Sequence, residues 1–295
     1  MEAALIVNPT SGRIRYPADI EKVEHCFRRA GEDITVLETE GPLHARELAA
    51  RASERGLNPV ISMGGDGTLN EVINGIAGGK TALGVIPTGI SNVLALELGI
   101  PSEIRAAADV IVAGETRTID LAEINGRFFS LMASIGLDAE ACRTVNPVLK
   151  RRLKRYAFHL SGLRALFSFR PGLFRIEIDG GEVLTGASAI ISNARFYGGR
   201  HVVTPEARVD DGFLDICVFS RKGAAASLRY FLGVLRKRVH EYPDVSVRRA
   251  TSVRIADPGL PIQIDGDFIG FTPAEIRIHP RALTVFCPGV NKSHD

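Results

Sequence analysis

The fold of this chain is decided by the stretch Val60-Ile61-Ser62-Met63-Gly64-Gly65-Asp66-Gly67-Thr68-Leu69-Asn70-Glu71. An apolar run leads into glycines, an aspartate and a threonine, and apolar residues then recur at helical spacing as far as Ile76. This pattern predicts a strand, a tight loop and the start of a helix. Glycine lets backbone N–H groups approach an anion closely, and the helix dipole favours negative charge there. The loop is therefore a candidate phosphate site.

Asp66, the acid within this loop, limits which phosphate ligands the loop can bind. Asp66 would repel a bare pyrophosphate, but it suits a phosphate that carries Mg²⁺, because this ion prefers carboxylate and other oxygen ligands. A dinucleotide fingerprint is disfavoured, since Asn70 stands where its third glycine would be. The Walker-like residues 75–81 are one residue short and follow a helix instead of opening one. The pattern favours a nucleoside triphosphate and phosphoryl transfer.

The first part of the chain, residues 1–117, alternates between apolar strand-like runs and helical patterns. We therefore expect an α/β domain with a doubly wound parallel sheet, covered by helices on both faces. The strand-like runs end at Val7, Leu37, Met63 and Ile86, and a polar loop follows each. These loops should share the carboxyl edge of the sheet, where open α/β folds bind ligands.

The second part, residues 118–295, changes to antiparallel β structure and is predicted to be a β-sandwich. A strand over 118–124 leads into Asn125-Gly126, which is typical of a hairpin, and Asp179-Gly180-Gly181 marks another turn. The last strand, about 283–295, either stays in this domain or returns to the first. The other expected strands are Arg127–Ala133, Arg175–Ile178, Val183–Ser192, Phe213–Phe219, Ser252–Ile255, Ile262–Ile264, Ile276–Ile278 and Leu283–Phe286.

Two helical insertions interrupt the sandwich, over residues 143–170 and 224–240. The first carries five basic residues between Lys150 and Arg155, followed by apolar residues, and contains no acid. Two interpretations stay open for it: a solvated basic helix face, or a surface that meets anionic lipid head groups. For the second insertion we favour the solvated face.

Composition excludes several classes of protein. A net charge of +2 is too small to argue for nucleic acid as a partner. The 4 cysteines are scattered without a CxxC pair, which indicates buried thiols in a reducing compartment. The N-terminus leads directly into a strand without a signal peptide, and no apolar run is long enough to span a bilayer. We expect a cytoplasmic protein.

Further short motifs occur in a set order along the chain. They are Asn8-Pro9, Ser11-Gly12, the glycine loop, Pro87-Thr88-Gly89-Ile90-Ser91-Asn92, Gly136-Leu137-Asp138-Ala139, Asn193-Ala194-Arg195-Phe196-Tyr197-Gly198-Gly199, Pro205-Glu206-Ala207, Asp210-Asp211-Gly212-Phe213-Leu214 and Asp265-Gly266-Asp267. Together they resemble the diacylglycerol kinase and sphingosine kinase superfamily, and the overall pattern looks like its soluble bacterial lipid kinases. NAD kinases and phosphofructokinases share the glycine loop but lack the later motifs.

The resemblance implies ATP-dependent, Mg²⁺-dependent phosphorylation of a diacylglycerol-like or sphingoid-like hydroxyl in a cleft between the two domains. Within the glycine loop, Asp66 takes a catalytic part by organising the phosphate and metal region. The residues that the resemblance places at the nucleotide are Asn8, Thr39, Gly64, Gly65, Asp66, Gly67, Thr68, Asn70, Thr88, Gly89 and Asn92.

The same resemblance gives Asp267 the place of the family's general base, which is often a glutamate. A carboxylate there accepts the proton of the substrate hydroxyl as it attacks the γ-phosphoryl group. A structural Mg²⁺ is implied at the Asp-Asp-Gly turn, held by the carboxylate of Asp211 and the carbonyl oxygens of Arg208 and Phe213. Without the resemblance, Asp211-Gly212 and Asp265-Gly266 would be interpreted as plain turns, and Asp138 as a strand cap.

Two departures from the family pattern keep other functions open. Ile90 stands where the family usually has threonine, and Val93 stands where many diacylglycerol kinases have an acid. One alternative is therefore a lipid- or nucleotide-binding protein without turnover, and another is a kinase of a soluble substrate related to NAD kinases. The leading hypothesis is a lipid kinase, peripheral at the inner membrane surface, that docks through residues 143–170. The acceptor lipid and the oligomeric state stay open, with a homodimer among the alternatives.

Overall fold

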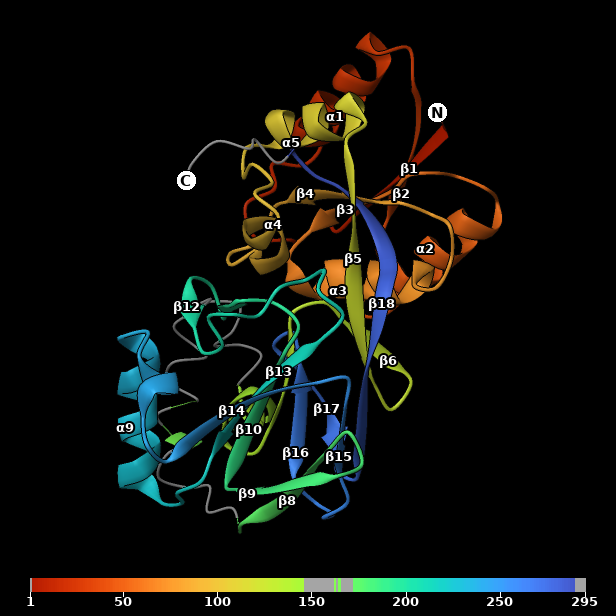
Figure 1. Cartoon of the computed structure of the whole chain (residues 1–295). Helices are drawn as coiled ribbons and strands as arrows, with labels where there is room; N and C mark the ends of the chain where they lie inside the picture. The colour runs from red at the N-terminus through yellow and green to blue at the C-terminus, as the bar shows by residue number, and fades with distance from the viewer. Residues whose placement is uncertain (1, 146–161, 163, 166–171, 290–295) are drawn as a thin grey trace. The chain divides into compact units, whose positions relative to one another are not determined.

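The computed structural model describes residues 2–145, 162, 164–165 and 172–289 (Figure 1). The chain divides into two compact units, of which unit 1 comprises Met1–Ile119 with Arg281–Asp295 and unit 2 comprises Asp120–Pro280. The division falls close to the expected boundary after residue 117, and the end of the chain belongs to unit 1.

Unit 1 is built on a parallel sheet. Strand β1 (Glu2–Val7) pairs with β2 (Asp33–Glu38) on one side and with β3 (Val60–Gly64) on the other, and β3 pairs with β4 (Leu83–Pro87). Beyond β4, the end of β18 (Ala274–Phe286) adds a further parallel strand. Strands β3 and β4 are buried along their whole length, as apolar runs covered on both faces should be.

Helices cover both faces of this sheet (Figure 1). Helix α1 (Ala18–Arg29) packs with α5 (Ile104–Ala113), and α2 (His44–Glu54) packs with α3 (Asp66–Ile76). The short helix α4 (Val93–Glu97) follows β4. The expected α/β domain with a doubly wound parallel sheet is confirmed.

Unit 2 is antiparallel and holds two groups of strands. One is a sheet in the order β14 (Val245–Ala250), β13 (Leu214–Phe219), β10 (Ser188–Ser192), β7 (Met132–Ile135), β16 (Pro261–Ile264) and β17 (Asp267–Phe271). The other contains β5 (Thr116–Ile124), β6 (Arg127–Phe129), β8 (Phe174–Ile178), β9 (Glu182–Gly186), β15 (Ser252–Ile255) and the first part of β18. A hairpin of β11 (Phe196–Tyr197) and β12 (His201–Val202) stands apart.

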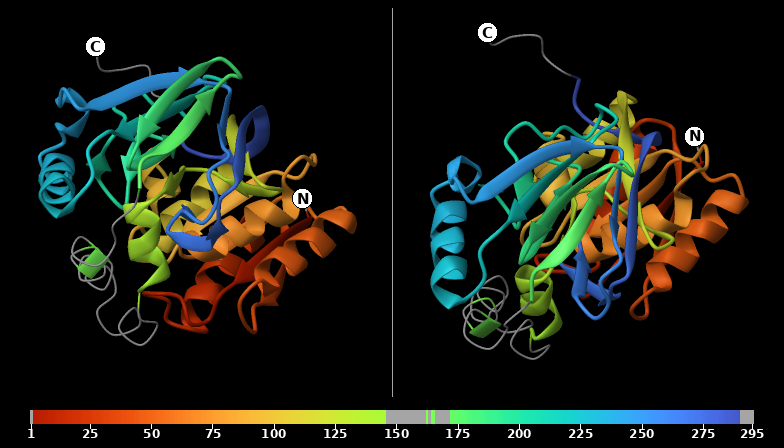
Figure 2. Two further views of the ribbon diagram at one scale, coloured as in Figure 1. Left: turned by 90° about the horizontal axis from the view of Figure 1, so that it is seen from below. Right: turned by 60° about the horizontal axis from the view of Figure 1, so that its bottom comes forward.

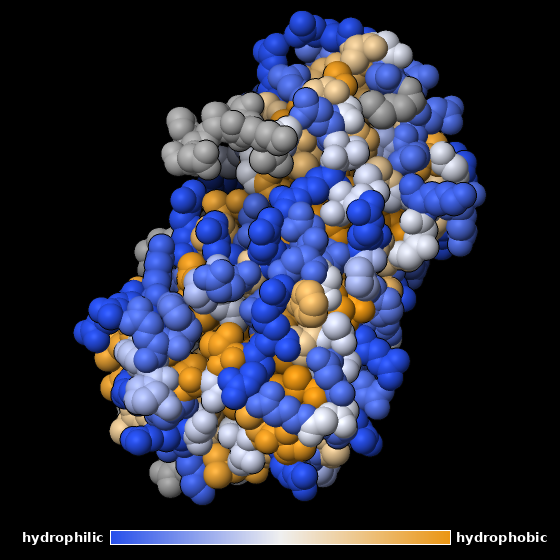
Figure 3. Space-filling model, viewed as in Figure 1, coloured by the Kyte–Doolittle hydropathy of each residue, from blue (hydrophilic) through white to orange (hydrophobic). Residues whose placement is uncertain are grey.

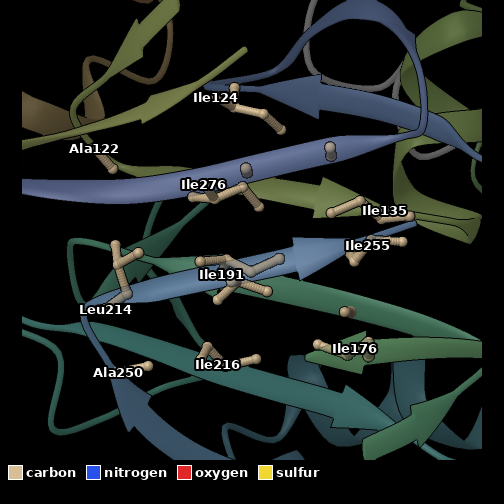
Figure 4. Close-up of a cluster of buried hydrophobic side chains, with 14 of the residues drawn as sticks. Ala122, Ile124, Ile135, Ile176, Ile191, Leu214, Ile216, Ala250, Ile255 and Ile276 are labelled. Carbon is tan, nitrogen blue, oxygen red and sulfur yellow. The ribbon is translucent and has the colours of Figure 1, made fainter. Parts of the chain in front are cut away.

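Side chains from the two groups of strands meet in one apolar core (Figure 4). Ile191 and Ile216 come from the first sheet, whereas Ile176, Ile255 and Ile276 come from the second group, and all five are fully buried. Two sheets that share one core in this way form a sandwich. The expected β-sandwich is therefore confirmed.

One expected strand of unit 2, over residues 127–133, is broken into β6 and β7. The break lies where the backbone N–H groups of Ser130, Leu131 and Met132 donate to the carboxylate of Asp265, each at 3.0 Å. Backbone donors that are bonded to a side chain cannot continue a strand ladder. The break is therefore set by a residue more than a hundred positions away, which local patterning does not reveal.

Two further expectations about strands also change. The strand expected over 183–192 becomes β9 and β10, because β9 pairs with β8 whereas β10 pairs with β7 and β13. The change of sheet passes Gly186, where a Cβ would lie 2.6 Å from the side chain of Val218. The strands expected over 276–278 and 283–286 form one strand, β18, which continues through residues 279–282 and belongs in part to each unit.

Of the two insertions, the first lies almost entirely outside the described residues, since only 143–145, 162 and 164–165 of it are described. Residues 137–143 form α6 (Leu137–Arg143) before it. The second insertion contains α9 (Ala224–Leu235) and a short 3₁₀ helix, Val239–Glu241. Across the described chain, no helix combines the length and apolar character that a membrane span needs. All four cysteines are free thiols.

The turn at Asp179-Gly180 is held by the side chain of Asp179. Its Oδ1 accepts the backbone N–H groups of Thr251 at 3.0 Å and Ser252 at 2.8 Å, together with both hydroxyls. Partial burial raises the pKa of Asp179, but these hydrogen bonds outweigh it and hold the pKa below its usual value.

We expect Asp179→Ala to lower the free energy of unfolding by about 1 kcal/mol at pH 7, because two backbone donors lose their acceptor. Since the folded-state pKa is depressed, this contribution is present above about pH 4 and is lost as the pH falls through the folded-state pKa. Urea unfolding at pH 7 and pH 3 measures it. A difference that is equally large at both pH values would contradict this account.

Candidate functional site in the two units

The loops at the carboxyl edge of the sheet in unit 1 are packed backbone against backbone. A Cβ on Gly89 would lie 2.5 Å from the Cα of Gly65, and a Cβ on Gly12 would lie 2.4 Å from the carbonyl oxygen of Thr88. Gly12 also has a φ of +37°, in the left-handed region. The loops that follow β1, β3 and β4 can therefore approach one another only because glycine stands at these points.

Hydrogen bonds join the same three loops. The Asn8 side chain donates from Nδ2 to Thr68 Oγ1 at 3.0 Å, so that the loop after β1 is joined to the first turns of α3. Thr88 donates its N–H to the Gly64 carbonyl and accepts the N–H of Arg13 on its own carbonyl, both at 2.9 Å. Thr68 and Thr88 are both buried where the loops meet.

The two acids of the glycine loop motif each bind the start of a neighbouring helix. Asp66 accepts the N–H groups of Asn92 at 2.9 Å and Val93 at 2.7 Å, where α4 begins. Glu71 accepts the N–H groups of Leu43 at 2.9 Å and Ala45 at 3.1 Å, where α2 begins. Carboxylates at these places satisfy helix N–H groups that have no partner within their own helix. Sequence reasoning assigned Asp66 to phosphate and metal and missed this supporting role.

The N-terminus of α3 is the part of this arrangement that suits an anion. Gly65 precedes the helix in an extended conformation and, as a glycine, brings no side chain that could cap it. The N–H groups of a first helical turn bind phosphate when no side chain takes them. Thr39 lies beside the end of β1, since its N–H donates to the Val7 carbonyl at 2.9 Å. All the predicted nucleotide residues therefore lie at one edge of unit 1, in its loops, at the end of β3 or in the first turns of α3.

The predicted base lies in a hairpin turn of unit 2. Asp265 and Gly266 form a two-residue loop with φ angles of 48° and 91°, and Asp267 begins β17 opposite Ile264. Such left-handed pairs are typical of tight hairpins. The carboxylate of Asp265 is the one that accepts three N–H groups from residues 130–132. The turn hypothesis and the functional hypothesis are therefore compatible, because the turn fixes where Asp267 stands.

The side chains of Gln263 and Asp138 hold this turn in place through a chain of hydrogen bonds. The side chain of Gln263 accepts the N–H of Gly266 at 2.7 Å and donates to Asp138 at 3.2 Å. Asp138 also accepts the hydroxyls of Ser134, at 2.6 Å, and of Tyr197. Burial raises the pKa of Asp138, although these hydrogen bonds act to lower it. The pKa of Tyr197 is also raised, mainly by burial and then by the nearby Asp138 carboxylate. The strand-cap hypothesis for Asp138 is wrong, since it lies in the first turn of α6.

The Asp-Asp-Gly turn is closed by an arginine. Asp211 accepts the N–H of Phe213 on Oδ1 at 3.1 Å and forms an ion pair with Arg249 on Oδ2 at 2.5 Å. The Arg249 guanidinium also lies 4.5 Å from the centre of the Phe213 ring. Among the described residues there is no group of three or more His, Cys, Asp or Glu that could hold a metal. The predicted site uses only one carboxylate beside two carbonyl oxygens, and that carboxylate is bound to Arg249, so the Mg²⁺ site at Arg208, Asp211 and Phe213 stays a prediction.

Comparisons with known proteins agree with these two units. The diacylglycerol kinase catalytic domain family matches residues 2–124, and the YegS C-terminal NAD kinase beta sandwich-like domain matches residues 132–287. A diacylglycerol kinase of Bacillus subtilis (strain 168) is 32% identical over 97% of this chain and 96% of the relative. The chain belongs to the diacylglycerol kinase family.

Other members of the family agree with this assignment. A diacylglycerol kinase of Mycobacterium tuberculosis is 33% identical over 96% of this chain and 94% of the relative. The crystal structure of a diacylglycerol kinase from Bacillus anthracis matches with a TM-score of 0.78 at 26% identity, covering 98% of this chain and 97% of that one. The superfamily expected from the motifs, and the enzyme class of lipid kinases, are confirmed.

The packing of the glycine loops predicts that Gly89→Ala lowers the free energy of unfolding by about 2 kcal/mol, because the new methyl group meets the backbone at Gly65. Gly41→Ala is the matched control, since nothing lies within 4 Å of a Cβ there. Denaturant unfolding of the two variants and the wild type measures the difference. Equal stability of the two variants would refute the tight packing of these loops.

The ion pair at Asp211 predicts that chelation of divalent ions leaves the unfolding temperature of the wild type unchanged. Arg249→Ala frees the Asp211 carboxylate, so the unfolding temperature of this variant should rise when millimolar Mg²⁺ is added. Arg254→Ala is the control, because the ion pairs that Arg254 forms with Glu177 and Glu275 are exposed. A fall in the unfolding temperature of the wild type on chelation would instead support the predicted metal site.

Proposed function

We propose that this chain transfers the γ-phosphoryl group of ATP to the hydroxyl of a diacylglycerol-like or sphingoid-like lipid. Mg²⁺ enters with ATP as part of the substrate. The observation that carries the proposal is the N-terminus of α3, where close-packed glycine loops meet and where the N-cap residue, Gly65, brings no side chain of its own. The relatives named diacylglycerol kinase support the lipid alcohol as acceptor.

Unit 1 binds ATP in this proposal. The backbone N–H groups between Gly64 and Thr68 hold the phosphates, because glycine leaves no Cβ in their way and the helix dipole favours their charge. Asp66 fixes the loop through Asn92 and Val93. Its carboxylate is the kind of oxygen ligand that suits the Mg²⁺ that accompanies ATP.

Unit 2 supplies the base. The carboxylate of Asp267 accepts the proton of the lipid hydroxyl while the hydroxyl oxygen forms its bond to the γ-phosphorus. The bond from that phosphorus to the bridging oxygen breaks, and ADP leaves with the negative charge. Asp265 and Gln263 keep the turn in place and are therefore positioning residues for Asp267.

The departure at Val93 does not argue against turnover. Val93 contributes its backbone N–H to Asp66, and any residue except proline at this position supplies the same donor. Ile90, the other departure, has 40% of its surface exposed and packs into no core. We therefore place turnover ahead of a protein that only binds lipid or nucleotide, and we place the protein at the cytoplasmic face of the membrane, where its lipid substrate lies.

The test is phosphate transfer from labelled ATP to a panel of lipids in mixed micelles with Mg²⁺. Diacylglycerol, monoacylglycerol, sphingosine and a polyprenol serve as acceptors, and NAD is the soluble control. We expect Asp267→Asn to lower kcat by about a hundredfold or more without changing the affinity for ATP, because only the proton acceptor is lost. Asp33→Asn, at an exposed strand end of unit 1, is the control and should behave as the wild type.

Each outcome decides between the functions. A labelled lipid made by the wild type and not by Asp267→Asn supports both the lipid kinase and its base. Labelled NAD would favour the kinase of a soluble substrate. If ATP binds and no acceptor is labelled, the kinase proposal fails and the binding protein takes its place.

A further inference from the structure

Helix α9 exposes a continuous apolar stripe. The stripe consists of Leu228, Phe231, Leu232 and Leu235, whose residues are 43%, 38%, 39% and 43% exposed. Their spacing of three and four residues places them on one face of the helix. In both views of Figure 2, α9 lies on the outside of unit 2 as the cyan helix. A solvated helix face, which we favoured from the sequence, does not account for four exposed large apolar residues in a row.

The opposite face anchors α9 to unit 2 and thereby fixes the direction of the stripe. Tyr230 is 7% exposed, its ring lies 4.9 Å from that of Phe219, and its hydroxyl donates to Asp244 at 2.8 Å. Arg229 donates to both oxygens of Asp244 at 2.8 Å. A Cβ on Gly233 would lie 2.9 Å from the Tyr242 ring. The apolar stripe therefore faces outward on a well-packed helix.

Basic residues lie at both ends of the helix that carries this stripe. Residues 221–244 contain six basic and two acidic residues. The acids are already paired, Asp244 with Arg221 and Arg229, and Glu241 with Arg238. The three basic residues at the two ends of α9 that form no ion pair within the described chain are Lys222, Arg236 and Lys237. Figure 3 shows hydrophobic and hydrophilic residues side by side over the part of unit 2 where α9 lies in Figure 1.

We propose that α9 is a docking surface for an anionic lipid bilayer. The helix lies along the membrane, with the apolar stripe at the boundary of the acyl chains and with Lys222, Arg236 and Lys237 at the head-group phosphates. Charge complementarity favours this occupant, because a second copy of the chain would bring the same positive ends together. The inference rests on the proposed function for its biological meaning, since it brings the enzyme to the surface that holds its lipid substrate.

The test is sedimentation with vesicles in the absence of ATP, using phosphatidylcholine alone and phosphatidylcholine with phosphatidylglycerol. Phe231→Ser with Leu235→Ser is expected to weaken binding to the anionic vesicles on the order of tenfold or more, because apolar area is lost from the membrane. Arg236→Gln with Lys237→Gln should weaken it by about fivefold for each charge removed. Val183→Ser is the matched control, since Val183 lies on β9 and is 44% exposed.

The outcomes separate docking from catalysis. Loss of vesicle binding in both α9 variants, with retention in Val183→Ser and Asp267→Asn, supports the docking surface whether or not phosphate transfer occurs. Binding of both α9 variants equal to that of the wild type would overturn the proposal. A dimer of the wild type that becomes a monomer in Phe231→Ser with Leu235→Ser, measured by analytical ultracentrifugation, would overturn it in favour of self-association. Unchanged circular dichroism of the variants ensures that weaker binding is not unfolding.

Discussion

The structure of unit 1 depends on the pair of hydrogen bonds from the N–H groups of Asn92 and Val93 to Asp66. They place the start of α4 against the loop after β3, in the region where Gly65 and Gly89 approach each other backbone to backbone. Glu71 acts in the same way on α2. One short stretch of chain thus sets the positions of three helix starts, its own included. A motif that suggests ligand binding is here equally an element of assembly.

In unit 2, as in unit 1, a carboxylate accepts backbone N–H groups from a distant segment, here at the hairpin turn of Asp265. Asp265 collects three N–H groups at the break between β6 and β7, while Gln263 holds Gly266 and is itself held by Asp138. Both acids of the glycine loop motif, and Asp265 of the hairpin, therefore accept backbone N–H groups. Asp267 begins the strand that follows the hairpin turn. Similar residues in similar motifs differ in role because of the donors that surround them.

The parallel sheet was predictable because its strands are buried on both faces and read as apolar runs, and the candidate loops were predictable because they follow those runs. The sandwich followed from the hairpin signals at Asn125-Gly126 and Asp179-Gly180. The break at residues 130–132 was not predictable, because its cause is Asp265, far away in the sequence. The Arg249 ion pair at Asp211 depends on strand pairing between β13 and β14 in the same way. Which face of α9 is anchored depends on Tyr242 and Asp244, which local periodicity does not include.

Strand β18 has a consequence for how the chain reaches its fold. It pairs with β4 through Val285 and Leu83, so the sheet of unit 1 is completed by a contact between residues about two hundred positions apart. During synthesis β4 remains an open, apolar edge until the whole of unit 2 has left the ribosome, and such edges invite wrong pairing. Unit 1 is therefore synthesised first but completed last, because its sheet needs the end of β18. Residues 2–124 made alone would lack the strand that closes their sheet.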